Sequence, residues 1–168
     1  MARRPAALAA IRLLVLDVDG VLTDGRLRYG PDGERDKVFH VRDGYGIKAL
    51  AADGVAIAVI SGRESAAVAR RCADLGILEL QQGVDDKAAA FTALAARLRV
   101  APGACACIGD DPPDVPLMKC VGLAIAVADA HVDARRAAHR RTRLPGGAGA
   151  VREVCDWLLA ARQLRGRR

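Results

Sequence analysis

The chain has 168 residues, of which 52% are hydrophobic and only 3% are aromatic. This length fits one domain, and the apolar content excludes a chain that is disordered throughout. The formal net charge of +6 comes from residues 129–168, which carry ten Arg and four acids, while the rest of the chain is balanced. A balanced main body argues against nucleic-acid binding.

The sequence shows no feature of export or of membrane insertion. The apolar run at 6–11 is too short for the core of a signal peptide, and no run approaches the roughly 20 apolar residues of a membrane-spanning helix. The five cysteines show no CxxC spacing. We therefore expect a reduced, cytoplasmic protein with no membrane partner.

Short apolar runs alternate with helical patterns along the chain. In chain order, strands are expected at Leu13–Leu16, Val55–Ile60, Leu78–Leu80, Ala104–Ile108 and Leu123–Val127. Helices are expected at Gly46–Ala52, Glu64–Leu75, Asp86–Leu98 and Gly149–Leu164. This alternation predicts a three-layer, Rossmann-like α/β fold, in which a parallel sheet is covered by helices on both faces. We expect residues 1–168 to form a single domain with a basic tail at about 160–168.

The segment Gly25–Val41 interrupts the alternation. Apolar residues flank a Gly-Pro-Asp-Gly turn there, which predicts a β-hairpin. The hairpin is a small insertion after the first strand, and no segment is long enough for a cap domain.

Polar side chains follow several of the predicted strands. Asp17 and Asp19 follow the first strand, Ser61 follows the second, and Asp110 with Asp111 follows another. The carboxyl ends of parallel strands meet at one edge of a sheet, where ligands bind. Carboxylates, a hydroxyl and the nearby Lys87 suit the binding of Mg²⁺ and the transfer of a phosphoryl group.

Four motifs, in order, resemble those of the haloacid dehalogenase-like phosphotransferases. They are DVDGVLTDG, SGR, the lysine of DDK, and GDDPPD. The segments YGPDGERDKVFHVRDGYGIKAL and GGAGAVREVCDWLL are further similar to those of one capless family within that group, the 3-deoxy-D-manno-octulosonate 8-phosphate phosphatases. The resemblance runs from about Leu13 to Leu159. It implies hydrolysis of this sugar acid phosphate during lipopolysaccharide synthesis.

The resemblance also implies roles for individual residues. Asp17 would be the nucleophile that forms an aspartyl phosphate, and Asp19 would be the general acid and base. Asp17, Asp110 and the backbone carbonyl of Asp19 would hold Mg²⁺, while Ser61 and Lys87 would bind the phosphoryl oxygens. Asp111 and Asp114 would orient these groups without themselves contacting the metal or the substrate.

The residues expected to contact the small anionic sugar phosphate form a larger set. Besides Asp19 and Lys87, they are His40, Val41, Arg42, Asp43, Gly44, Lys48, Arg63 and Arg71. The chain departs from the family at Pro112 and at Ala148, where a larger apolar residue and a basic residue are usual.

A capless monomer would leave such a site open to water, and the family closes it by forming a tetramer. We therefore expect a homotetramer. Two alternatives stay open: a phosphatase for another nonulosonate or sugar phosphate, and a non-enzyme such as a phospho-accepting receiver domain or an inactive scaffold.

Overall fold

The structure is a computed structural model that describes residues 7–166, with the backbone alone at 165 and 166. The last two residues of the expected basic tail lie outside the described range. The sheet strands are β1 (Leu13–Leu16), β4 (Ala56–Ile60), β5 (Glu79–Gln81), β6 (Cys105–Gly109), β7 (Leu123–Ala126) and β8 (Arg140–Arg141), and the hairpin strands are β2 (Arg28–Gly30) and β3 (Gly33–Asp36). The helices are α1 (Val41–Ala52), α2 (Ala66–Leu75), α3 (Lys87–Arg97), α4 (Val115–Cys120), α5 (Val132–Ala137) and α6 (Ala150–Gly166), with 3-10 turns η1 (Leu8–Ala10), η2 (Pro102–Ala104) and η3 (Pro112–Asp114).

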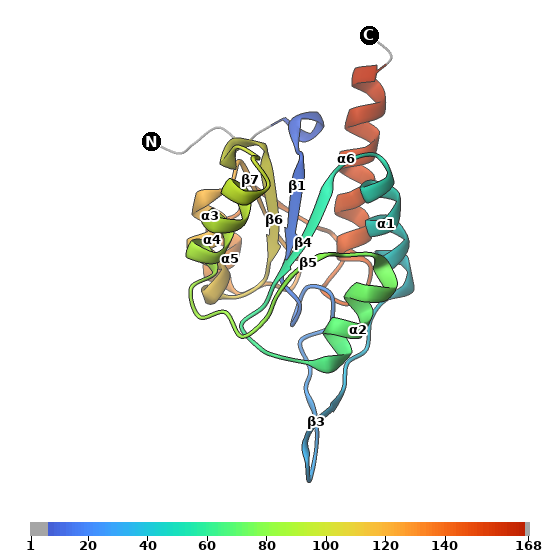
Figure 1. Cartoon of the computed structure of the whole chain (residues 1–168), viewed down its shortest axis with the longest axis vertical. Coiled ribbons are helices and arrows are strands. Elements are labelled where there is room, and N and C mark those ends of the chain that lie inside the picture. The colour runs from blue at the N-terminus through green and yellow to red at the C-terminus, as the bar shows by residue number, and fades with distance from the viewer. Residues whose placement is uncertain (1–6, 167–168) are drawn as a thin grey trace.

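The fold is the predicted three-layer α/β sandwich. Six strands pair in the order β5-β4-β1-β6-β7-β8, and every pair is parallel. Helices α1, α2 and α6 cover one face of the sheet, and α3, α4 and α5 cover the other (Figure 1). The five predicted strands are confirmed, and β8 extends the sheet by one short edge strand that the sequence pattern did not indicate.

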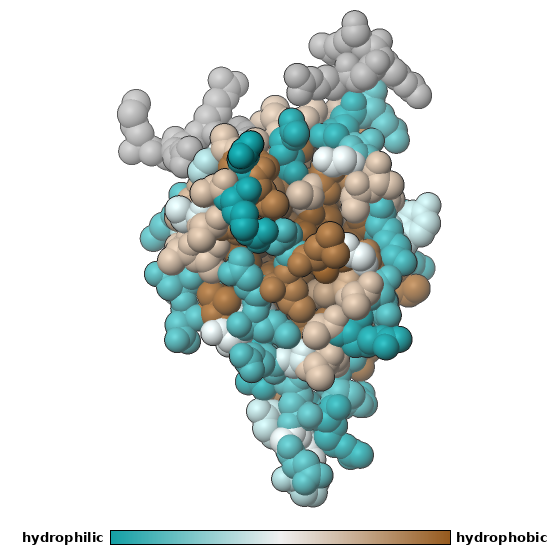
Figure 2. Space-filling model, viewed as in Figure 1, coloured by the Kyte–Doolittle hydropathy of each residue, from teal (hydrophilic) through white to brown (hydrophobic). Residues whose placement is uncertain are grey.

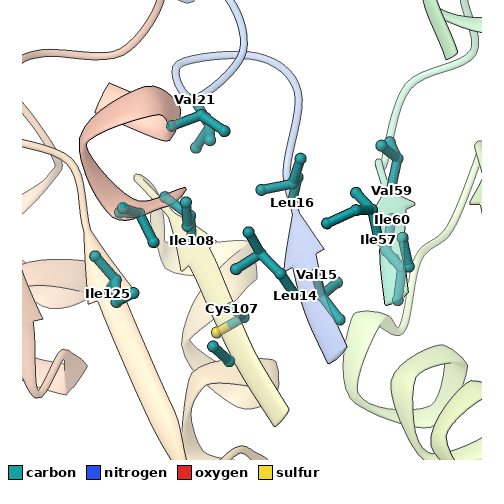
Figure 3. Close-up of a cluster of buried hydrophobic side chains, with 14 of the residues drawn as sticks. Leu14, Val15, Leu16, Val21, Ile57, Val59, Ile60, Cys107, Ile108 and Ile125 are labelled. Atoms are coloured by element: carbon teal, nitrogen blue, oxygen red, sulfur yellow. The ribbon is translucent and has the colours of Figure 1, made fainter. Parts of the chain in front are cut away.

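The core is centred on β1. All four of its residues are buried, and the strand pairs with β4 on one side and β6 on the other. Figure 3 shows the aliphatic side chains of these three strands packed together, with Leu14 and Leu16 between the residues of β4 and β6. A central strand buried on both faces is apolar at every position. Its end therefore fixes Asp17 and the following loop at the middle of the carboxyl edge.

The insertion after β1 is a two-stranded hairpin, as predicted. Strands β2 and β3 pair antiparallel around the turn at 31–32 and project beyond the carboxyl edge of the sheet (Figure 1). The surface of this projection is mostly hydrophilic, whereas apolar residues gather in the middle of the same face of the molecule, over the region of edge strand β5 (Figure 2). Within the described residues, none of the helices combines the length and the apolar character that a membrane crossing needs.

The predicted start of one helix is wrong, and two helices were not predicted. Helix α1 begins at Val41 rather than Gly46, because the His40 side chain caps it by accepting a hydrogen bond from the Arg42 N–H at 3.2 Å. Helices α4 and α5 were not predicted, and α6 continues into the expected tail, as far as Gly166.

Candidate active site

The loop after β1 is held by its own backbone. The N–H groups of Val21, Leu22 and Thr23 all donate to the carbonyl of Val18, at 3.1, 2.9 and 3.1 Å. Gly20 has a φ of +85°, and a Cβ at this position would lie 2.0 Å from Asp110 Oδ2. A side chain there would thus be strained and would displace Asp110. Glycine allows the loop after β1 and the loop after β6 to approach each other.

Glycines near the end of the chain brace the same loop. A Cβ on Gly146 would lie 1.8 Å from the carbonyl oxygen of Gly20, and one on Gly147 would lie 2.4 Å from the Asp24 nitrogen. The Gly147 N–H also donates to the Val21 carbonyl at 3.0 Å. Backbone therefore packs directly on backbone here, which explains why this position requires two consecutive glycines.

Lys87 lies at the start of α3 and joins two carboxylates. Its Nζ is 2.8 Å from Asp17 Oδ1 and 2.7 Å from Asp114 Oδ1, and its side chain is only 5% exposed. Burial alone would lower the pKa of Lys87, but the two aspartates outweigh that effect and raise it. Lys87 is therefore a fixed positive charge beside Asp17.

The loop after β6 is organised by Asp114. Its Oδ2 accepts hydrogen bonds from the backbone N–H groups of Asp110 and Asp111, at 2.9 and 3.2 Å. With Oδ1 bound to Lys87, both oxygens of Asp114 have partners. Pro112 lies in the turn η3, at the start of which the ring is tolerated. Pro112 therefore does not prevent the three aspartates of this loop, Asp110, Asp111 and Asp114, from lying close to one another.

Three carboxylates converge where these loops meet. Asp17, Asp110 and Asp114 each bring one oxygen within 4.8 Å of the others. Burial, followed by repulsion from Asp114, raises the pKa of Asp17 to about 7; burial and the neighbouring aspartates raise that of Asp110 to about 8. Asp110 Oδ1 is buried without a hydrogen-bond partner among the described residues. An unpartnered buried carboxylate oxygen in a cluster of acids fits a hard cation such as Mg²⁺.

Ser61 lies at the end of β4, buried, beside this cluster. Its backbone N–H donates to the Gln81 carbonyl at 2.9 Å, and its Oγ accepts from the Arg63 N–H at 3.3 Å. The hydroxyl keeps its own hydrogen for a ligand oxygen.

These groups surround one pocket of about 280 Å³. It lies at the carboxyl ends of β1, β4 and β6, where a parallel sheet is expected to bind its ligand. Its lining residues are Asp17, Asp19, Gly25, Ser61, Gly62, Arg63, Lys87, Asp110, Asp111, Pro113 and Asp114.

Two hairpin residues that the sequence analysis missed reach this pocket's rim. Lys37 Nζ contacts Asp19 Oδ1 at 2.5 Å and Glu34 Oε1 at 3.2 Å. Arg63 binds Glu34 Oε2 at 2.9 Å and Tyr29 Oη at 3.2 Å, and its Nε lies 3.7 Å from Asp19 Oδ2. Burial alone would raise the pKa of Glu34, but hydrogen bonds from Arg63 and Lys37 hold it below its ordinary value. The only sequence signal was that these charges lie in an insertion directly after the acidic loop.

The other residues expected to contact substrate do not line this pocket. They lie around the start of α1 and on α2, and they are His40, Val41, Arg42, Asp43, Gly44, Lys48 and Arg71. Asp43 is buried and accepts a hydrogen bond from the Arg152 N–H at 2.8 Å, and burial raises its pKa. Arg42 lines a separate hollow of about 480 Å³ with Ala148 and Arg152. Arg71 packs over the Phe39 ring, 5.9 Å from its centre.

A carboxylate pair after the central strand, beside a buried lysine and an acidic loop, defines a phosphatase of the haloacid dehalogenase-like class. Residues 73–144 match the family model described as haloacid dehalogenase-like hydrolase. The 3-deoxy-D-manno-octulosonate 8-phosphate phosphatase of Escherichia coli K12 is 52% identical over 151 residues, which span 90% of this chain and 80% of the relative. The chain belongs to the 3-deoxy-D-manno-octulosonate 8-phosphate phosphatase family.

Solved structures agree with this assignment. The crystal structure of the Yersinia pestis enzyme of the same name superposes with a TM-score of 0.91 at 48% identity, covering 94% of this chain and 85% of that one. The crystal structure of the Moraxella catarrhalis enzyme, in complex with a magnesium ion, a phosphate ion and a KDO molecule, superposes with a TM-score of 0.91 at 40% identity. The match covers 96% of this chain and 92% of that one.

Proposed function

We propose that this chain is a magnesium-dependent phosphatase that hydrolyses 3-deoxy-D-manno-octulosonate 8-phosphate to the free sugar acid and phosphate, in lipopolysaccharide synthesis. The observation that carries this proposal is the pocket in which Asp17, Asp19, Ser61, Lys87 and Asp110 meet. Relatives at about 50% identity bear the name of this reaction.

We assign the attack on phosphorus to Asp17. Its buried carboxylate lies beside Lys87, whose charge favours the ionised, nucleophilic form. An Asp17 oxygen bonds to phosphorus as the bond from phosphorus to the sugar oxygen breaks. Asp19 gives its proton to that departing oxygen. Asp19 then takes a proton from the water that cleaves the aspartyl phosphate, which restores both carboxyl groups and releases phosphate.

Ser61 and Lys87 are assigned to the phosphoryl oxygens, because both line the pocket and can donate hydrogen bonds. Asp17, Asp110 and the backbone carbonyl of Asp19 would hold Mg²⁺, and Asp111 and Asp114 would support them. The cation supplies charge neutralisation for the phosphoryl oxygens.

We propose a homotetramer in which a neighbouring subunit helps to close the site. Large apolar side chains are exposed on the hairpin and at the start of α1: Leu27, Tyr29, Val38, Val41 and Tyr45. Such a group of exposed apolar residues is typical of an interface. Residues 40–44, with Lys48 and Arg71, would then contact a substrate held in the pocket of another copy.

We place the enzyme in the cytoplasm. The five cysteines are all unpaired, and four of them are buried. Thiols that stay reduced fit that compartment.

The direct test measures phosphate release with Mg²⁺ from the eight-carbon sugar acid phosphate and from common hexose phosphates. We expect strong preference for the former. Asp17→Asn should abolish release while the protein still folds, because the amide cannot attack phosphorus. Equal turnover of unrelated phosphates would contradict the substrate assignment, and retained turnover in Asp17→Asn would contradict the nucleophile.

A further inference from the structure

Four charged side chains form a closed ring at the rim of the pocket. Lys37 contacts Asp19 Oδ1 at 2.5 Å and Glu34 Oε1 at 3.2 Å. Arg63 contacts the other oxygen of each acid, Glu34 Oε2 at 2.9 Å and Asp19 Oδ2 at 3.7 Å. Signs alternate around the ring, so each carboxylate lies between two cations. Lys37 and Glu34 come from the hairpin segment, and the other two come from the loops after β1 and β4.

Lys37 is the most buried member of this charge ring. Its side chain is 2% exposed, compared with 15% for Glu34, 20% for Asp19 and 41% for Arg63. Burying an ammonium group is costly unless it is paired, so the contacts of Lys37 with both acids determine where it lies. Lys37 does not line the pocket, whereas Asp19 does. Lys37 is therefore placed to act on Asp19 rather than on the substrate.

We infer that Lys37 and Glu34 are positioning residues for Asp19, an inference that rests on the general acid role proposed above. Lys37 fixes Asp19 Oδ1, which leaves Oδ2 on the side of the pocket-lining Arg63. Glu34 fixes Lys37 and Arg63 together. The hairpin thus sets the orientation of the carboxyl group that delivers a proton to the departing sugar oxygen as the bond from that oxygen to phosphorus breaks.

The identity of the leaving group distinguishes this role from a general loss of structure. An alkoxide leaves slowly unless it is protonated as it departs, whereas p-nitrophenolate leaves readily without a proton. The ratio kcat/KM reports the steps up to release of the leaving group. A misplaced Asp19 should therefore lower kcat/KM for an alkyl phosphate and spare kcat/KM for p-nitrophenyl phosphate.

The experiment compares kcat/KM of Lys37→Met, Lys37→Arg and wild type on p-nitrophenyl phosphate and on whichever sugar phosphate the wild type hydrolyses best. For Lys37→Met we expect a loss of about 10–100-fold on the sugar phosphate and under about 3-fold on the aryl ester. Lys37→Arg should recover part of the loss. Asp19→Asn gives the reference pattern. Lys119→Met is the matched control: Lys119 is an exposed cation of α4, away from the hairpin, with no ion pair among the described residues, and its removal should change neither value.

A burst measurement adds a second readout. Because Asp19 also serves as base in the second step, Lys37→Met should release p-nitrophenolate in a rapid burst followed by slow turnover. Equal losses on both substrates, or no loss on either, would overturn the inference. If Lys37→Met does not fold, Glu34→Gln takes its place, because it keeps the shape of the side chain and removes the charge. Its kcat/KM on the sugar phosphate and on p-nitrophenyl phosphate then tests the inference in the same way. Failure of the wild type on the eight-carbon sugar acid phosphate alone would refute only the proposed substrate.

Discussion

At the scale of single residues, the site concentrates negative charge that the fold alone does not neutralise. Asp17 and Asp114 share Lys87, whereas Asp110 Oδ1 has no hydrogen-bond partner among the described residues. Both Asp17 and Asp110 have raised pKa values as a result of burial and repulsion within the cluster. Proteins accept this kind of local instability at functional sites. The loss of stability caused by this cluster should therefore be measurable in the metal-free protein.

The free energy of unfolding of the metal-free protein should fall as the pH rises from about 4 through 8. Both carboxyls have an ordinary pKa of 3.8, raised in the folded state to about 7 for Asp17 and about 8 for Asp110. The folded state thus binds more protons in this range, and its stability is lost as the pH passes the folded pKa values. Asp110→Asn should flatten this dependence and raise the Tm at pH 8 without metal.

Thermal unfolding with and without Mg²⁺ checks this prediction. Added Mg²⁺ should stabilise the wild type more than Asp110→Asn, because the amide is a weaker ligand. Lys87→Met is the opposite control, since it leaves the aspartates without their cation and should lower the Tm. A flat pH profile for the metal-free wild type would show that repulsion in the cluster is negligible.

At the scale of elements, the strand ends were predictable and their supporting contacts were not. Buried strands are recognisable in a sequence as apolar runs. The sequence therefore predicted that Asp17, Ser61 and Asp110 lie at the carboxyl ends of strands. The cap that His40 provides depends on the rotamer of its side chain, which a sequence does not show. Helix α4 was missed because prolines lie at its start, and prolines in a sequence usually indicate a loop. Lys37 and Glu34 matter only through the fold, which brings them against Asp19.

The glycine pair near the end of the chain should control the loop after β1. Gly146→Ala should destabilise the protein by about 1–3 kcal/mol and reduce activity, because its Cβ would displace the Gly20 carbonyl. Gly103→Ala is the matched control, since no heavy atom lies within 4 Å of its added Cβ. Denaturant unfolding and phosphate release measure both effects. Full activity and stability in Gly146→Ala would show that the loop accommodates the extra methyl group.

At the scale of the whole molecule, the pocket at the carboxyl edge of the sheet and the excess positive charge involve different residues. The excess positive charge includes exposed arginines at α5 and β8, among which Arg140 stacks on the Trp157 ring at 4.9 Å. The pocket itself is lined by five aspartates and two cations, Arg63 and Lys87. The net charge of +6 therefore describes residues 129–168, none of which lines the pocket, and not the composition of the pocket.

Sedimentation should give a mass of four 17.7 kDa chains at working concentration. Val38→Asp should shift the distribution to smaller species and lower the activity, because Val38 is 62% exposed on the hairpin segment and would be buried between copies. Leu78→Asp is the control: Leu78 is 90% exposed, next to the edge strand β5, away from the proposed interface. A monomeric wild type would refute the tetramer.

The brace that Gly146 and Gly147 place on the loop after β1 also has a consequence for the order of synthesis. Asp17, the proposed nucleophile, is synthesised well before Gly146 and Gly147, whose backbone fixes the loop that follows Asp17. A nascent chain stalled before that point carries its acids without the brace that holds their loop. We therefore expect competence for phosphoryl transfer only after Gly147 has left the ribosome.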